Sequence, residues 1–292
     1  MNKIKSLAVA VTLAVAAGSV HAKIATGQSG NGELFLSVWD QVGAKSYVRD
    51  LGITMNDFGT LNAPTQTAAA PGSFVNYVDS NAGSSKSWAT DTTWATFTAG
   101  KTAAEINSFV WDVYAMDGVG TTAAHTKRYL TTTNADVLAF ATTPLTQQSN
   151  GQLDSFSITN GYLNAINSDP DGQSVSLGDD TANGSGIFLS GSFAYMGDAA
   201  KAASWGGKAA FSTAANVGTS LDFYYGTRSG GTSTQEALFY KYGNASGDAT
   251  FLLANDGSLA YQVAAVPEAE TWAMFGAGLL MVGAIARRRM AS

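Results

Sequence analysis

The chain has 292 residues, of which 13% are charged and 45% hydrophobic, with two histidines and no cysteine. The lack of cysteine excludes a disulfide scaffold, a cysteine nucleophile and an iron–sulfur or cysteine–zinc site. The formal net charge is −6, and no basic stripe is present to meet phosphates, so the composition argues against a nucleic-acid-binding protein.

The first 22 residues have the three parts of a secretory signal peptide. Two lysines lie within Met1–Lys5, an apolar run covers Leu7–Ala17, and the small residues Val20 and Ala22 occupy the positions preferred before a cut. We therefore expect signal peptidase to cleave between Ala22 and Lys23. The alternative is a buried N-terminal helix of a cytoplasmic protein.

The C-terminal residues combine a proline stop, an apolar run and a cationic end. Val266-Pro267-Glu268 precedes Trp272, an apolar run extends to Ala286, and Arg287-Arg288-Arg289 follows. A helix from Trp272 to Ala286 would measure about 22 Å at 1.5 Å per residue, which is short of a hydrocarbon core of about 30 Å. The arginines would stay on the cytoplasmic side of the inner membrane and leave residues 23–265 outside.

This arrangement resembles the PEP-CTERM sorting signal of exported proteins from Gram-negative bacteria, although Ala269 stands where the usual motif has a second proline. The residues that carry the resemblance are Val266, Pro267, Glu268, Trp272, Arg287, Arg288 and Arg289. The resemblance implies recognition by an exosortase, which is a membrane cysteine protease, and cleavage near Pro267. It also implies a producer that makes exopolysaccharide and a biofilm or floc. The alternative is an ordinary C-terminal membrane anchor that is never processed.

The sequence thus divides into a signal peptide at residues 1–22, a body at residues 23–265 and a sorting signal with a membrane helix at residues 266–292. The body has 11 basic and 20 acidic side chains, a net charge of −9 that favours solubility. Its length suits one domain, because sandwiches of this size are common. Without disulfides, its stability must come largely from burial of apolar side chains.

Apolar and polar residues alternate along much of the body, which is the pattern of half-buried strands. Such runs cover residues 33–39, 108–114, 187–195, 221–225 and 238–242. Asp256-Gly257 between two further runs, Thr250–Ala254 and Ser258–Val263, predicts a hairpin. We therefore expect an all-β body, a single antiparallel β-sandwich of the jelly-roll type, flanked by an N-terminal signal helix and a C-terminal hydrophobic helix.

Four segments depart from the strand pattern. Residues 102–107 predict a short helix, because Thr102 can cap it and Glu105 follows three residues later. Residues 131–136 lack an apolar face, and residues 59–71 and 83–93 are rich in Thr, Ala, Ser and Gly, so all three predict exposed loops.

Few residues offer catalytic chemistry. His125 is the one histidine of the mature chain and lies in a polar stretch, which favours a solvated loop residue over a general base. Two carboxylates facing each other could hydrolyse a polysaccharide. Asp112 and Asp222 lie on the polar faces of aromatic-rich strands and could flank a sugar, but the same pattern fits solvent-facing residues that keep a sheet soluble.

Two kinds of binding residue stand out. Asn167, Asp169 and Asp171 place oxygen side chains at alternate positions before a glycine turn, as in the first half of a calcium-binding loop, but no glutamate follows at position twelve. The pattern also fits a plain acidic turn. Trp88, Trp94 and Trp205 stand beside polar loops and, if exposed, could stack on sugar rings. The alternative, which is the commoner place for tryptophan, is that each packs in the core.

The leading hypothesis is an exported, non-enzymatic protein of the envelope or extracellular matrix that needs no cofactor and could bind exopolysaccharide. Its expected partners are signal peptidase, an exosortase and, transiently, the inner membrane. The alternative is a secreted polysaccharide hydrolase that uses paired carboxylates.

Overall fold

The structure is a computed structural model of the whole chain. It describes residues 24–27, 30–58, 75–77, 85–119, 126–134, 149–154, 162–164, 166–167, 184–192, 195, 212–235, 237–244, 247–263 and 279–282. The calls made from the sequence on His125, Asp169, Asp171 and Trp205, on residues 59–71, and on both cleavage points lie outside the described residues, as do most residues of the two terminal signals.

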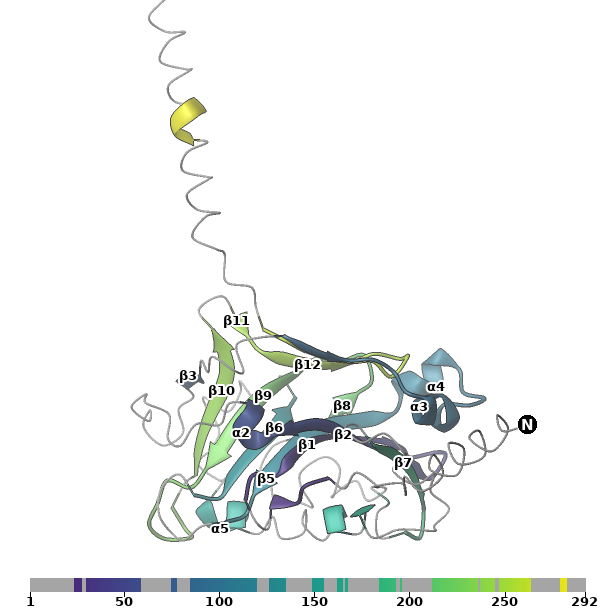
Figure 1. Cartoon of the computed structure of the whole chain (residues 1–292), viewed down its shortest axis with the longest axis horizontal. Coiled ribbons are helices and arrows are strands. Elements are labelled where there is room, and N and C mark those ends of the chain that lie inside the picture. Colours follow the sequence, from purple (N-terminus) through teal and green to yellow (C-terminus); the bar gives the residue numbers. More distant parts are fainter. Residues whose placement is uncertain are drawn as a thin grey trace, which may run out of the picture.

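Strands dominate the described part of the chain (Figure 1). The strands are β1 (Glu33–Asp40), β2 (Lys45–Thr54), β3 (Val75–Tyr77), β4 (Lys86–Trp88), β5 (Val110–Asp117), β6 (Arg128–Thr133), β7 (Ser185–Leu189), β8 (Ala215–Asn216), β9 (Leu221–Thr227), β10 (Leu238–Asn244), β11 (Gly247–Asp248), β12 (Thr250–Leu253) and β13 (Leu259–Gln262). The helices are short: α2 (Met55–Phe58), α3 (Thr92–Phe97), α4 (Ala103–Asn107) and α5 (Asn150–Asp154).

The strands form one connected sheet with the order β4-β13-β12-β9-β6-β5-β1-β2-β7. All of its strand pairs are antiparallel except β10–β3, which is parallel. The sheet curls like half a barrel, so that β12 faces β1 and β2 across the interior (Figure 1). The predicted all-β, antiparallel class is therefore confirmed. The finer prediction of a jelly-roll sandwich is not, because the described strands belong to a single sheet.

The expected terminal helices are not confirmed either. Residues 279–282 are helical. Within the described ranges, however, no helix is both long enough and apolar enough to cross a membrane.

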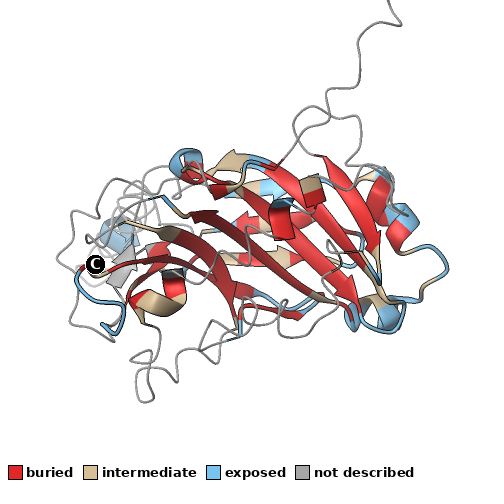
Figure 2. Cartoon of the chain, turned by 90° about the horizontal axis from the view of Figure 1, so that it is seen from below, coloured by how far each residue is buried: buried red, intermediate tan, exposed pale blue. Residues whose placement is uncertain are grey.

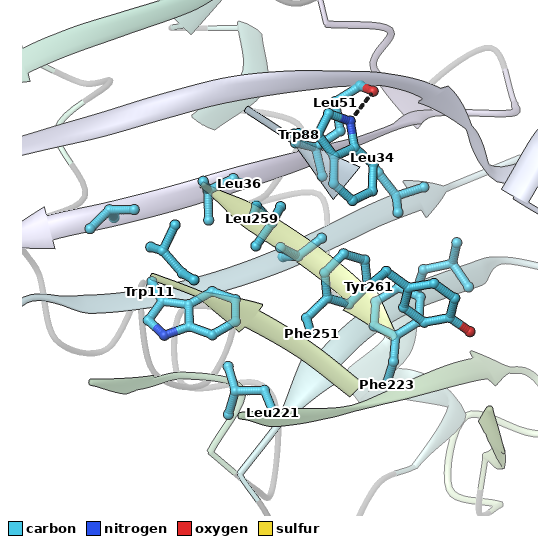
Figure 3. Packing of buried hydrophobic residues seen from close by; sticks show 14 of the residues in the cluster. Leu34, Leu36, Leu51, Trp88, Trp111, Leu221, Phe223, Phe251, Leu259 and Tyr261 are labelled. Carbon is cyan, nitrogen blue, oxygen red and sulfur yellow. Dashed lines mark hydrogen bonds between the residues drawn. The ribbon is translucent and has the colours of Figure 1, made fainter. Parts of the chain in front are cut away.

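The main core fills the concave side of the sheet, which we call the inner face. Leu34, Leu36 and Val38 of β1 point there, as the alternation predicts, and meet Trp111 of β5 and aromatic residues from β9, β12 and β13 (Figure 3). The aromatic rings pack closely, and the centroids of Phe223 and Phe251 are 4.8 Å apart in an edge-to-face arrangement. Figure 2 shows the result, with buried residues along the strands and exposed residues in the turns.

A second cluster covers part of the opposite side, which we call the outer face. The residues of this cluster are Ile24, Phe35, Trp39, Val48, Tyr114, Tyr162, Leu163, Ile166 and Phe188. Phe35 and Trp39 alternate with the inner residues of β1, so this strand is buried on both faces. The outer cluster explains why almost every residue of β1 is buried, whereas a half-solvated strand would have every second residue exposed.

Local signals in the sequence gave correct predictions. The helix α4 has Thr102 as its N-cap, and the Thr102 and Glu105 side chains form a reciprocal capping box. The turn at Asp256-Gly257 joins β12 to β13, with Gly257 at φ +86° and the Asp256 carboxylate accepting from the Ser258 amide at 2.9 Å. Both features depend on residues that are neighbours in the chain.

Two loop predictions are wrong. Thr131–Thr133 belong to β6, which lies between β5 and β9 in the centre of the sheet. Residues 83–93 contain β4 and the start of α3, whose N-cap is Asp91. The predicted strand over residues 187–195 is correct only in its first part, since β7 ends at Leu189 and Gly191 adopts φ +105°.

The sheet forks along one edge of β9. Leu221 and Asp222 pair with β12, while the later residues Tyr224–Thr227 pair with β10. β10 then pairs with the short β11, which leads directly back into β12. The two branches therefore separate just beside Asp222.

Candidate functional site

Polar side chains line up across the outer face of the central strands. Ser37 of β1 pairs with Asp112 of β5, and Thr133 of β6 pairs with Asp222 of β9. Because Tyr114 pairs with Thr131, Asp112 stands beside Thr133 two residues further along. The four residues therefore form one row, and the α-carbons of Asp112 and Asp222 lie two strand spacings apart, about 10 Å.

A second row runs beside the first. Its members, in order across β1, β5, β6, β9 and β10, are Phe35, Tyr114, Thr131, Tyr224 and Lys241. We call these two rows the outer polar rows. All nine residues are buried, although all of them except Phe35 carry a hydroxyl, carboxyl or ammonium group that can hydrogen bond. Buried polar groups in such number need partners, and the partners define the chemistry of the site.

Asp112 has an incomplete set of partners. The Thr213 hydroxyl donates to its Oδ2 at 3.3 Å, whereas Oδ1 has no hydrogen-bond partner among the described residues. Only 1% of the residue is exposed. Burial raises the pKa of the Asp112 carboxyl well above its usual range, and the hydrogen bond from Thr213 offsets this only in part. The site therefore favours the neutral, protonated form of Asp112.

Two phenols lie close to Asp112. The hydroxyl groups of Tyr162 and Ser37 are 3.5 Å apart. Burial raises the pKa of Tyr114 and of Tyr162, and the charge of Asp112 raises both further whenever this carboxyl is ionised. These phenols stay neutral and can offer hydrogen bonds, so this end of the rows is uncharged.

Asp222 has the opposite environment. Its Oδ2 accepts from the Lys241 ammonium at 2.7 Å, and Lys241 also donates to Asp248 of β11 at 2.6 Å. Burial lowers the pKa of Lys241, but the hydrogen bonds and charges of the two carboxylates outweigh it and raise the pKa overall. Lys241 Nζ also lies 5.8 Å from the centroid of the Tyr224 ring. This end of the rows is an ion-paired cluster at the fork of the sheet.

The prediction that Asp112 and Asp222 face solvent is wrong. Both lie on the predicted face of their strands, but Asp112 is 1% and Asp222 8% exposed. The reason is that the outer face of these central strands is covered rather than open. The surroundings of Asp112 favour a protonated carboxyl and those of Asp222 favour an ionised one, which is the combination that an acid–base pair requires. In this structure, however, neither carboxyl is open to a polysaccharide chain.

Trp88 and Trp94 are not exposed either, so neither is placed to stack on a sugar. Trp88 packs in the inner core, where its indole nitrogen donates to the Leu51 carbonyl at 2.9 Å (Figure 3). Trp94 lies edge-on to Tyr47, with ring centroids 5.3 Å apart. A side-chain carbon at Gly257 would lie 2.3 Å from the Trp94 ring, so the backbone of the hairpin turn packs directly against this indole.

Asn167 has a structural partner. Its amide side chain bonds to both backbone groups of Ile24, accepting from the amide at 3.0 Å and donating to the carbonyl at 2.8 Å. Its oxygen is thus engaged with the chain rather than with an oxygen ligand set. Across the part of the chain that the structure describes, no group of three or more His, Cys, Asp or Glu side chains could hold a metal ion.

Leu279, Leu280, Met281 and Val282 are exposed, by 59%, 77%, 66% and 65%. They fall within the predicted apolar run of the sorting signal, and the helical turn that they form lies away from the sheet (Figure 1). Four adjacent large apolar side chains in water are unfavourable.

Sequence reasoning missed Lys241, Thr133 and Tyr162. A signal existed only for Lys241, which is the one charged residue in the aromatic strand 238–242. Comparison of the chain with protein-family models, with curated proteins and with solved structures gives no match.

Proposed function

We propose that this chain is an exported protein of the bacterial envelope or extracellular matrix, cut by signal peptidase after Ala22 and released by an exosortase near Pro267. In this proposal the β body serves as a structural unit and carries no catalytic site. The mature protein leaves the inner membrane when the C-terminal signal is removed.

The observation that carries the proposal is the C-terminal combination of Val266-Pro267-Glu268, the apolar run and Arg287-Arg288-Arg289. The exposed side chains of Leu279–Val282 support it, because a lipid phase would remove them from water at about 25 cal/mol per Å² of apolar surface. The cationic end favours the cytoplasmic side and so holds the body outside.

The body itself suits an exported structural unit. The described strands run from Glu33 to Gln262, inside the predicted mature range, and their stability comes from two apolar clusters without any cysteine. The buried carboxylates of the outer polar rows act within the fold as a neutral acid and as an ion pair. Trp88 and Trp94 are core residues, so they are not the residues that would bind exopolysaccharide. The proposal places such binding on other residues at the surface of the body.

The sorting half of the proposal is tested in the producing cell. Replacing Pro267 and Glu268 by alanine, or the three C-terminal arginines by alanine, should leave the protein uncut in the membrane fraction. The matched control is Ala269→Pro, which restores the usual Pro-Glu-Pro and should keep release at least at the wild-type level. Release of the variants at the wild-type rate would contradict the proposal.

One observation favours a second function, hydrolysis of polysaccharide. Asp112 and Asp222 share a row, and their surroundings favour a neutral and an ion-paired carboxyl respectively. Incubating the purified protein with the producer's exopolysaccharide separates the functions. New reducing ends that disappear in Asp112→Asn would establish hydrolysis, whereas retention of the protein without cleavage supports a binding role.

A further inference from the structure

The residues that follow the predicted signal cleavage point are tied to the body. Ile24 is 1% exposed and packs in the outer cluster with Leu163 and Ile166. Both of its backbone groups bond to the Asn167 side chain, at 3.0 and 2.8 Å. Next to it, the Ala25 amide donates to the Glu33 carboxylate, and the Glu33 amide donates to the Ala25 carbonyl at 3.1 Å.

The path of the next residues is fixed by backbone contacts. The Gly118 amide donates to the Gly27 carbonyl at 2.8 Å, and the Gly32 amide donates to the Met116 carbonyl at 3.2 Å. A side-chain carbon at Gly27 would lie 2.0 Å from the Met116 carbonyl oxygen, and one at Gly32 would lie 2.2 Å from it. Residues 24–27, which we call the strap, are therefore held against the end of β5, where only glycine fits at Gly27.

We infer that this strap, once closed, protects the junction between Ala22 and Lys23, so that signal peptidase must act before the strap closes. The inference rests on the proposed export. A protease binds its substrate in an extended form over several residues on either side of the bond, and a folded segment must open locally before it can be cut. Ile24 is the second residue after the bond, and it is buried with both backbone groups engaged.

The order of events that follows from the buried Ile24 is signal cleavage first and strap closure second.

Hydrogen exchange on the exported, processed protein tests the strap without depending on the order of cleavage. In Asn167→Ala the Ile24 amide should exchange at least 10-fold faster, while the amide of Leu36 in β1 keeps its protection. Asn167→Asp is the comparison variant, because it keeps an oxygen that accepts from the Ile24 amide and replaces the donor to the Ile24 carbonyl by a carboxylate oxygen. It should retain part of the protection. An Ile24 amide that exchanges at the same rate in all three proteins would overturn the strap.

Cleavage of the full chain by a bacterial signal peptidase tests the order. The purified full chain in detergent should be cut at least 10-fold more slowly when it is folded than when it has been unfolded in urea. The urea is diluted, just before the peptidase is added, to a concentration that does not inhibit the enzyme. Folded Asn167→Ala should be cut faster than folded wild type. Equal rates for all three would overturn the protective strap and leave the export proposal standing. Failure to cut even the unfolded chain after Ala22 would instead contradict the signal peptide and with it the inference.

Discussion

Asp112 and Asp222 carry the same functional group on the same row of the sheet, yet their surroundings oppose each other. Among the described residues, Asp112 has one weakly engaged oxygen and no cation that favours its ionised form, whereas Asp222 meets the Lys241 ammonium at 2.7 Å. A buried carboxyl without a cation is stable as the neutral acid, and a buried ion pair is stable only while both partners remain.

Asp112→Asn should therefore stabilise the protein above neutral pH. The folded-state pKa of Asp112 is raised, so its folded form holds a proton that the unfolded chain has lost, and stability falls as the pH rises past the unfolded value of about 3.9. An asparagine removes that loss, and we expect a gain of at least about 1 kcal/mol at pH 8 and little change at pH 4. Urea unfolding at both pH values measures it.

Asp222→Asn is the matched control for this substitution. It should destabilise the protein at pH 8 by about 3 kcal/mol, because it removes one partner of a buried ion pair. Two substitutions of the same kind on one row are thus expected to have opposite signs. If both destabilise the protein equally at pH 8, the difference assigned to their surroundings is wrong.

Asp50 gives a second pH-dependent term. Burial raises its pKa to about 7; the hydrogen bond from the Gly52 amide lowers it, and the charge of Glu33 raises it again. Stability from this group is present below pH 4 and is lost as the pH rises towards 7. An NMR titration should give a midpoint near 7 for Asp50, and Glu33→Gln should lower that midpoint. A midpoint near the usual value of about 4 would contradict the burial argument.

At the scale of elements, an ion-paired cluster holds β10 and β11 to β9 where the sheet forks. Lys241 of β10 bonds to Asp222 of β9 and to Asp248 of β11, so one ammonium group joins three strands where β10 separates from β12. The Lys241 and Asp222 ends are buried, while 44% of the Asp248 side chain is exposed.

Lys241→Met should loosen this fork. Methionine fills a similar volume but leaves the Asp222 carboxylate buried without a cation, and we expect a loss of about 3 kcal/mol. Hydrogen exchange should speed up in β10 and β11 and stay slow in β1 and β2. Asp248→Asn should cost less than about 1 kcal/mol, because its pair with Lys241 is partly in solvent. Faster exchange spread evenly over all strands would argue against a local clamp.

The elements that sequence predicted correctly are those whose signals are local. Thr102 and Glu105 cap each other within one turn, and Asp256-Gly257 closes a hairpin between adjacent strands. β6 was missed because Thr131–Thr133 have no apolar alternation. Their place depends on distant partners, and the Thr132 hydroxyl donates to the Thr213 carbonyl, 81 residues away, at 2.8 Å.

The same distinction applies to the candidate site. The alternation in 108–114 and 221–225 placed Asp112 and Asp222 on the correct faces of their strands. Their alignment depends on β6, which pairs with both strands, and their burial depends on how the outer face is covered. Neither property is encoded by residues near Asp112 or Asp222 in the chain. For the same reason the sequence left open whether Trp88, which lies in a polar stretch, is exposed or buried, and the structure packs it in the core.

At the scale of the whole molecule, a curled sheet with apolar clusters on both faces provides stability without disulfides. The inner cluster joins strands from both halves of the curl, and the outer cluster recruits Ile24 at the start of the predicted mature chain. The described strands end at Gln262, just before the predicted sorting signal. The described strands and the two predicted processing signals thus occupy separate parts of the chain.

The intact mass of the protein recovered from outside the inner membrane tests the export account most directly. The account predicts a single polypeptide that begins at Lys23 and ends near Pro267, without the apolar run and the three arginines. Recovery of the 292-residue chain from the cytosol, with the masses of both terminal segments still present, would contradict it.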